Sequence, residues 1–251
     1  MMIDVLASEQ LKIRTLRSTW YILGIVIALV GLCGVAGWNM ASQWDSLGPQ
    51  QRAVFGFTPL VSLASGVASL CLAVLGVLAI TSEYATGEIH TSFTVVPRRR
   101  TILAAKAVVV VVIATISGSV VSLGAFFASR LVEAQASISA ELPLLLAAGL
   151  SVTMFSMIGL GFGALLKSAT GAIAVPVALL YLLPTVAQSL QSPWNEVIGS
   201  LAPSALAGQL AGGENTDPSS WLSPLAALGL MVAYAAAPLG LAAVRITRED
   251  A

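Results

Sequence analysis

The stretches LPLLLAAGLSVTMFSMIGLGFGALL (residues 142–166) and ATGAIAVPVALLYLLPTVAQSL (residues 169–190) are apolar runs separated only by Lys167 and Ser168. Each run reaches or exceeds the roughly 20 residues that a helix needs to cross about 30 Å of hydrocarbon. The two-residue turn between them predicts antiparallel helices that pack side by side. The two runs therefore indicate a polytopic membrane protein.

Four further apolar stretches bring the number of predicted membrane spans to six. The composition agrees, because 57% of the residues are hydrophobic and only 10% are charged, whereas about 25% charged residues is usual in soluble domains. We therefore expect one all-α membrane domain over residues 1–251. The predicted spans are 20–38, 58–80, 101–129, 142–166, 169–190 and 221–244.

The basic residues fall mainly in alternate gaps between these spans. If the N-terminus is cytoplasmic, ten of the 12 Lys and Arg residues lie inside, and only Arg52 and Arg130 lie outside. Inner loops of membrane proteins carry such an excess, so we predict that both termini are cytoplasmic. Topology thus explains the basic residues, which give no indication of a nucleic-acid partner. The inner ones are Lys12, Arg14, Arg17, Arg98, Arg99, Arg100, Lys106, Lys167, Arg245 and Arg248.

Two segments outside the spans are also predicted to be helical. Residues 2–19 have a broad apolar face, and Lys12, Arg14 and Arg17 would meet anionic lipid if this helix lies in the inner interface. The alternative is that these three cations only fix the topology. The segment 191–220 is too long for a bare connection, so we expect short interfacial or re-entrant helices there. Pro176 and Pro184 predict kinks in the fifth span.

The sequence contains no constellation typical of an enzyme. His90 is the single histidine, and no Cys, His and carboxylate spacing predicts a metal site. Lys167 and Ser168 lack the preceding glycine of a phosphate loop, so this chain is not expected to bind ATP. Glycines 159, 161 and 163 lie within a span, where close helix packing explains them. Cys33 and Cys71 also lie within spans and are not expected to form a disulfide.

The spans contain almost no ionisable groups. Lys106, near the inner end of the third predicted span, is the exception. Transporters driven by protons or sodium ions usually need carboxylates or broken helices near the midplane. The sequence therefore argues against a secondary transporter.

The cytoplasmic segment 82–97 predicts a short amphipathic helix. Ser82 would cap it, Glu83 would be an exposed acid in its first turn, and Pro97 would end it. Such a helix, with Glu88 and His90 also exposed, is suited to docking in a groove of another protein. The alternative is an amphipathic connector that faces lipid, and the residues alone leave both open. Its apolar stripe is Ala85, Ile89, Phe93 and Val96.

Three stretches of this chain together resemble the permeases of ABC-type-two exporters, the membrane subunits of ATP-binding-cassette transporters. The first cytoplasmic loop of this family is similar to Glu83-Tyr84-x-x-Gly87-x-Ile89, with Val96-Pro97-Arg98-Arg99-Arg100 and Leu103-Ala104-Ala105-Lys106 after it. The N-terminal helix of actinobacterial members resembles Ala7-Ser8-Glu9 and Lys12-x-Arg14-x-x-Arg17-Ser18-Thr19-Trp20. Their tight inner turn resembles Leu165-Leu166-Lys167-Ser168-Ala169-Thr170-Gly171-Ala172-Ile173.

The resemblance implies a non-catalytic exporter subunit in the bacterial cytoplasmic membrane. A separate ATPase would bind ATP and Mg²⁺, and a second copy or a similar permease would complete the transporter. A hydrophobic or amphipathic compound would be moved outward between the two copies, past spans two and five. The implied coupling residues are Glu83, Tyr84, Glu88, Ile89, His90 and Phe93, and the candidate pathway residues are Ser62, Ser65, Ser69, Thr185 and Gln188.

One position departs from the family pattern. Members commonly carry Gly-Thr-Ile where this chain has Gly87-Glu88-Ile89, so we assign no partner charge to Glu88. An alternative function from another class is a non-transporting sensor or immunity module that binds an extracellular peptide or a lipid-linked ligand. Such a module would need no ATPase, and a neighbouring ATPase gene would therefore favour the exporter.

Overall fold

The elements in the part of the chain that the structure describes are helices. The computed structural model describes residues 17–43, 48, 57–86, 99–130, 138–212 and 222–248. Within these residues six helical stretches are long and apolar enough to span a membrane, which confirms the predicted all-α membrane fold. The spans are Thr19–Asn39, Val61–Thr86, Ile102–Ala128, Glu141–Leu166, Ala169–Ser189 and Pro224–Arg245.

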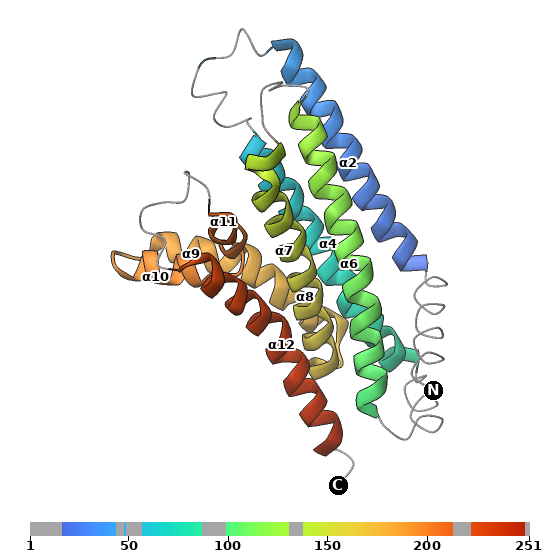
Figure 1. The fold of residues 1–251 in the computed structure, drawn as a ribbon. Helices are drawn as coiled ribbons and strands as arrows, with labels where there is room; N and C mark the ends of the chain where they lie inside the picture. Colours follow the sequence, from blue (N-terminus) through green and yellow to red (C-terminus); the bar gives the residue numbers. More distant parts are fainter. Residues whose placement is uncertain are drawn as a thin grey trace.

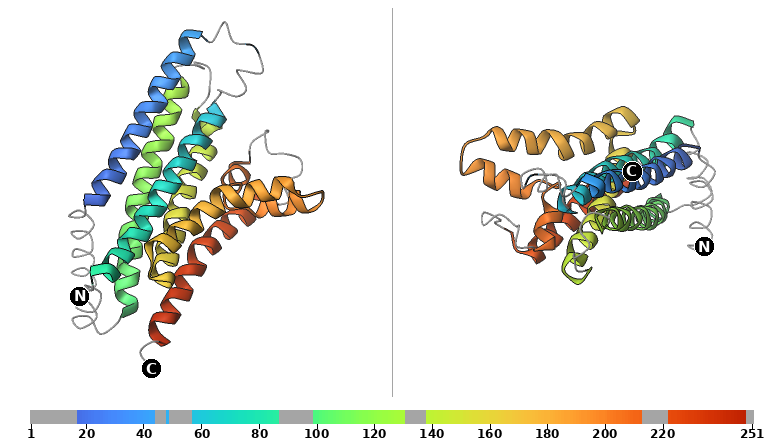
Figure 2. Two further views of the ribbon diagram at one scale, coloured as in Figure 1. Left: turned by 180° about the vertical axis from the view of Figure 1, so that it is seen from behind. Right: turned by 90° about the horizontal axis from the view of Figure 1, so that it is seen from above.

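Four long helices lie side by side, and two further spans tilt away from them (Figures 1 and 2). The four are α2 (Arg17–Gln43), α4 (Phe57–Thr86), α6 (Arg99–Arg130) and α7 (Ile138–Leu166). The fifth span contains α8 (Ala169–Val177), the π-helical turn η2 (Ala178–Leu182) and α9 (Leu183–Ser189). The short helices α10 (Trp194–Leu201) and α11 (Leu206–Ala211) precede the sixth span, α12 (Pro224–Arg248).

Two segments differ from the prediction or lie beyond the described residues. The second span was expected to end near Ile80, but α4 continues to Thr86. Residues 2–16 of the predicted interfacial helix at 2–19 lie outside the described residues. Its last three residues, 17–19, belong to α2, which begins at Arg17. The short helices expected in the segment 191–220 are present as α10 and α11.

The contact between α4 and α7 is made by glycines that let the two backbones touch. A Cβ atom on Gly76 of α4 would overlap the carbonyl of Ser156, and one on Gly159 of α7 would overlap the carbonyl of Ala73. The Ser156 hydroxyl donates a buried hydrogen bond of 3.0 Å to the carbonyl oxygen of Leu72 on α4. Small residues allow such close approach between membrane helices, where burial in lipid gives little driving force.

Helix α7 is the central helix of the bundle. On another side of α7, a Cβ on Gly161 would lie 2.7 Å from the Cβ of Pro238 in α12. Thr115 of α6 and Thr153 of α7 share a hydrogen bond of 3.1 Å between their hydroxyl oxygens. The packing interpretation of the glycines at 159, 161 and 163 is therefore confirmed, and the three face two different helices.

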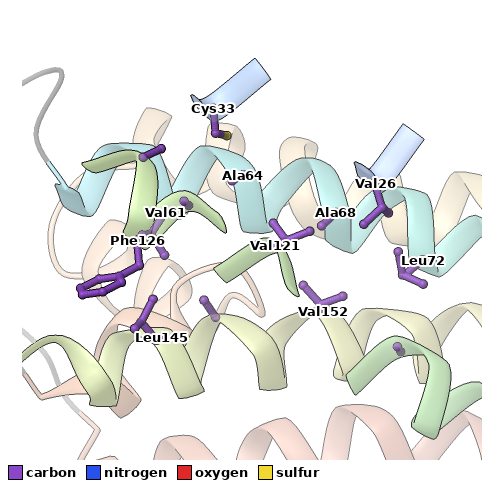
Figure 3. Packing of buried hydrophobic residues seen from close by; sticks show 14 of the residues in the cluster. Val26, Cys33, Val61, Ala64, Ala68, Leu72, Val121, Phe126, Leu145 and Val152 are labelled. Carbon is purple, nitrogen blue, oxygen red and sulfur yellow. The ribbon is translucent and has the colours of Figure 1, made fainter. Parts of the chain in front are cut away.

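A cluster of buried side chains joins α2, α4, α6 and α7 at the end away from Lys167 (Figure 3). Cys33 of α2 lies in this cluster, and both Cys33 and Cys71 are free, which confirms that they form no disulfide. Labelled members include Val26, Val61, Ala64, Ala68, Leu72, Val121, Phe126, Leu145 and Val152.

We predict that Gly159→Ala destabilises the fold while Gly149→Ala on the same helix does not. The new methyl group at 159 would overlap the carbonyl of Ala73, whereas one at 149 would meet only ordinary contacts at 3.8 Å. Overpacking of this kind typically costs about 1–3 kcal/mol. Thermal unfolding of the two purified variants in detergent measures the difference. Equal melting temperatures would contradict the proposed backbone contact.

Candidate functional site

Four helix ends meet where the second and third spans approach residues 87–98. At this end α4 finishes at Thr86, α6 begins at Arg99, and Lys167 and Ser168 form the turn between α7 and α8. We call it the Lys167 end. Among the predicted coupling residues, Glu83 and Tyr84 belong to α4. Glu88, Ile89, His90 and Phe93 lie outside the described residues.

Glu83 and Lys106 form a buried ion pair between α4 and α6. The Lys106 Nζ donates to the Glu83 Oε1 at 3.0 Å, and the two side chains are only 2% and 7% exposed. The expectation of an exposed Glu83 in the first turn of a new helix is therefore wrong. The second span carries a buried carboxylate at its end, in addition to the Lys106 that the sequence identified.

The helix continues past the expected break, and two hydroxyl groups there bond within it. Thr81 donates to the carbonyl of Val77 at 2.9 Å, and Ser82 donates to that of Leu78 at 2.7 Å. Ser and Thr can satisfy earlier carbonyls in this way inside a membrane helix. Ser82 is thus an interior residue of α4 rather than the cap of the next helix.

Tyr84 lies next to Glu83 and contacts the turn between α7 and α8. The Lys167 Nζ lies 5.7 Å from the centre of the Tyr84 ring, within the range of a cation–π interaction. Lys167 has a positive φ of 52°, and its backbone N–H donates to the carbonyl of Gly163 at 3.0 Å. This left-handed residue ends α7 and reverses the chain into α8, as is common at helix C-termini.

Helix α12 reaches the same end through Arg245. Its Nη1 atom donates to the carbonyl oxygen of Leu165 at 2.8 Å. A cation at the C-terminus of α7 is favourable because the last carbonyls of a helix carry partial negative charge. A cluster of buried apolar residues from α4, α6, α7 and α12 also lies toward the Lys167 end. It includes Ala79, Ile80, Leu103, Val110, Leu160 and Ala242.

The five candidate pathway residues are not brought together within the chain. Ser62 is exposed, Ser65 is partly buried and donates to the carbonyl of Ser62 at 3.1 Å, and Ser69 is only 1% exposed. Thr185 and Gln188 are exposed on α9, which leads away from α4 in Figures 1 and 2. The Thr185 hydroxyl donates to the carbonyl of Tyr181 at 2.7 Å.

Two polar contacts join the short helices α10 and α11 to each other and to α12. Gln209 donates through Nε2 to the carbonyl of Ser200 at 2.9 Å, and it is buried. The Tyr234 hydroxyl donates to the carbonyl of Leu201 at 3.1 Å. Neither residue was singled out from the sequence, since a glutamine in a loop and a tyrosine in a span carry no spacing signal.

A search of curated proteins finds no significant match to this chain. The sequence model of the ABC-2 family transporter proteins matches residues 3–251, which is nearly the whole chain. This match agrees with the six apolar spans. The chain therefore belongs to the ABC-2 transporter family.

Proposed function

We propose that this chain is the permease subunit of an exporter that moves a hydrophobic or amphipathic compound outward across the cytoplasmic membrane. The observation that carries the proposal is the family match over residues 3–251. Members of this family are generally non-catalytic membrane subunits and normally partner with a separate ABC ATPase. In this proposal ATP and Mg²⁺ bind the ATPase.

The Lys167 end faces the cytoplasm in this proposal. The predicted inner segments contain ten basic residues, and Lys167 and Arg245 lie at this end. The orientation places residues 87–98 on the cytoplasmic side, where an ATPase would reach them. Ile89 and Phe93 are the proposed apolar anchors, with Glu88 and His90 on the exposed face of the same segment.

A second copy, or a similar permease, completes the pathway in the proposal. Ser62, Ser65, Thr185 and Gln188 remain candidates to line it, because each has a surface that another chain can reach. Ser69 is enclosed by its own chain at 1% exposure, so we omit it from the proposed lining. The scarcity of charge on the spans supports an apolar or amphipathic substrate.

We predict that single cysteines label according to this orientation when Cys33 and Cys71 are replaced by Ala. A membrane-impermeant maleimide added to intact cells should label Ser42→Cys, exposed in the last turn of α2, and Gln191→Cys, exposed between α9 and α10 in the predicted outer segment. It should label Ala85→Cys and Ser168→Cys, exposed at the Lys167 end, only after permeabilisation. Labelling of Ala85→Cys in intact cells would reverse the orientation.

We predict that Phe93→Ala weakens binding of the ATPase. Truncating a well-buried aromatic anchor typically costs more than about 2 kcal/mol, which is about a 30-fold rise in Kd. The first partner to test is an ATPase with a phosphate loop encoded in a neighbouring reading frame. Binding is measured by surface plasmon resonance with the permease in nanodiscs.

The matched control is Phe127→Ala, the same substitution at a residue of α6 that is 66% exposed on the spanning surface. It should leave the Kd unchanged. If Phe93→Ala also has no effect, the segment 87–98 is a connector rather than an ATPase contact. If the unaltered permease binds no ATPase at all, the sensor or immunity alternative is favoured.

We also predict that the assembled complex contains two permease chains and two ATPase chains. The reason is that the candidate pathway residues of one chain are divided between α4 and α9, which leads away from α4 in Figures 1 and 2. Native mass spectrometry of the co-expressed complex measures the stoichiometry. A stable complex of one permease with one ATPase would contradict a pathway shared between copies.

A further inference from the structure

We propose that Glu83 and Lys106 are positioning residues that clamp α4 to α6, so that the two helices move as one unit when the segment between them is displaced. The clamp itself is a property of this chain. Its role in transmitting force from an ATPase rests on the proposed function. Neither residue is proposed to contact ATP or the transported compound.

The position of the pair relative to the segment 87–98 supports a clamp. Glu83 lies in the last turn of α4, and Lys106 lies seven positions after Arg99, the first residue of α6. At 1.5 Å per residue this places Lys106 about 10 Å along α6. The two residues therefore join the helices on both sides of the segment, close to the points where it leaves them.

The Lys106 ammonium group could extend to water at the Lys167 end, but in the structure it does not. Side chains on a helix point toward its N-terminus, and here that direction leads to the Lys167 end. A lysine near the end of a span can extend its ammonium group to water in this way at little cost. Instead Lys106 is among the most fully buried side chains, with 2% exposure, and its Nζ reaches Glu83.

Glu83 is also placed against the dipole of its own helix. An acid in the last turn of a helix is disfavoured by the partial negative charge at that end, and Glu83 has this position in α4. Lys106 lies about two turns into α6, beyond the reach of the charge at that helix end. Local helix stability therefore does not account for Glu83, and the ion pair with Lys106 offsets its unfavourable position.

Stability of the bundle alone is a weak reason for a buried ion pair. Removing charge from water is expensive, and an apolar pair of similar volume is often as stable or more stable. What the ion pair adds is a directional, charge-assisted hydrogen bond that resists sliding between α4 and α6. Ionisable groups within membrane spans are usually retained for function.

Because α4 also touches α7 through glycine backbones, the clamp would join α6 to the centre of the bundle at the Lys167 end. Tyr84 follows Glu83 directly and contacts Lys167 in the turn that starts the fifth span. A displacement of residues 87–98 would therefore reach α8 through a rigid α4–α6 unit rather than bend one helix.

The test compares the permease with two double variants in nanodiscs. Glu83→Gln with Lys106→Met removes both charges of the pair together, so neither is left buried without the other and the bundle should still fold. Glu83→Lys with Lys106→Glu reverses the pair and places a base in the last turn of α4, where the helix dipole favours it. Amide hydrogen exchange is followed at residues 79–86 and 102–110 without any ATPase.

We expect exchange in these two stretches to rise at least about tenfold in the neutral variant and to return to the original rate in the reversed variant. Exchange at 61–68 and 119–125, toward the other ends of the same helices, is the internal control and should not change. If the neutral variant exchanges at the original rate, or if the reversed variant does not restore it, the clamp is overturned.

A second measurement addresses force transmission with the ATPase bound. Spin labels at Ala85 and Ala104, both exposed, report the short distance between α4 and α6 through dipolar broadening. Trapping with ATP and vanadate should leave this broadening unchanged in the unaltered protein and change it in the neutral variant. Equal broadening in both would overturn the transmission role, even with the clamp intact. Failure of the unaltered permease to bind an ATPase would instead count against the proposed function, while the exchange result would still decide the clamp.

Discussion

The close approach of α4 and α7 is the constraint on which the rest of the bundle depends. Glycines at 76 and 159 remove the two Cβ atoms that would otherwise separate the helices, and each backbone then lies against the other's carbonyl groups. In lipid, van der Waals contact between closely packed helices takes the place of the hydrophobic driving force that packs soluble cores. With α4 fixed on one side of α7, the remaining sides are left for α6 and α12, and α2 stays peripheral.

The Lys167 end adds polar contacts to this apolar frame. Each of them joins a different pair of elements: Glu83 with Lys106, Tyr84 with the turn at Lys167, and Arg245 with the last turn of α7. Polar groups at such a depth are stable only where they find partners. The helix ends on either side of residues 87–98 are therefore joined to one another by charged groups as well as by apolar packing.

The membrane fold was predictable because hydropathy and span length are local properties of the sequence. The burial of Glu83 was not, because it depends on Lys106, which lies 23 positions away on another helix. Thr81 and Ser82 suggested a break by their polarity, but their hydroxyls bond to carbonyls of the preceding turn within a continuous α4. The pathway residues were chosen by polarity alone, and one of them, Ser69, is enclosed by its own chain. Partner surfaces between copies cannot be derived from one chain's pattern.

The π-helical turn at Ala178–Leu182 gives the fifth span one surplus residue of register, immediately before Pro184. In an α-helix each residue adds about 100° of rotation and 1.5 Å of rise. Conversion of this turn to regular α-helix would thus rotate α9 by about 100° relative to α8 without breaking the chain's path. Thr185 and Gln188 would then face a different neighbour. The π-helical turn consequently sets which face of the fifth span carries Thr185 and Gln188.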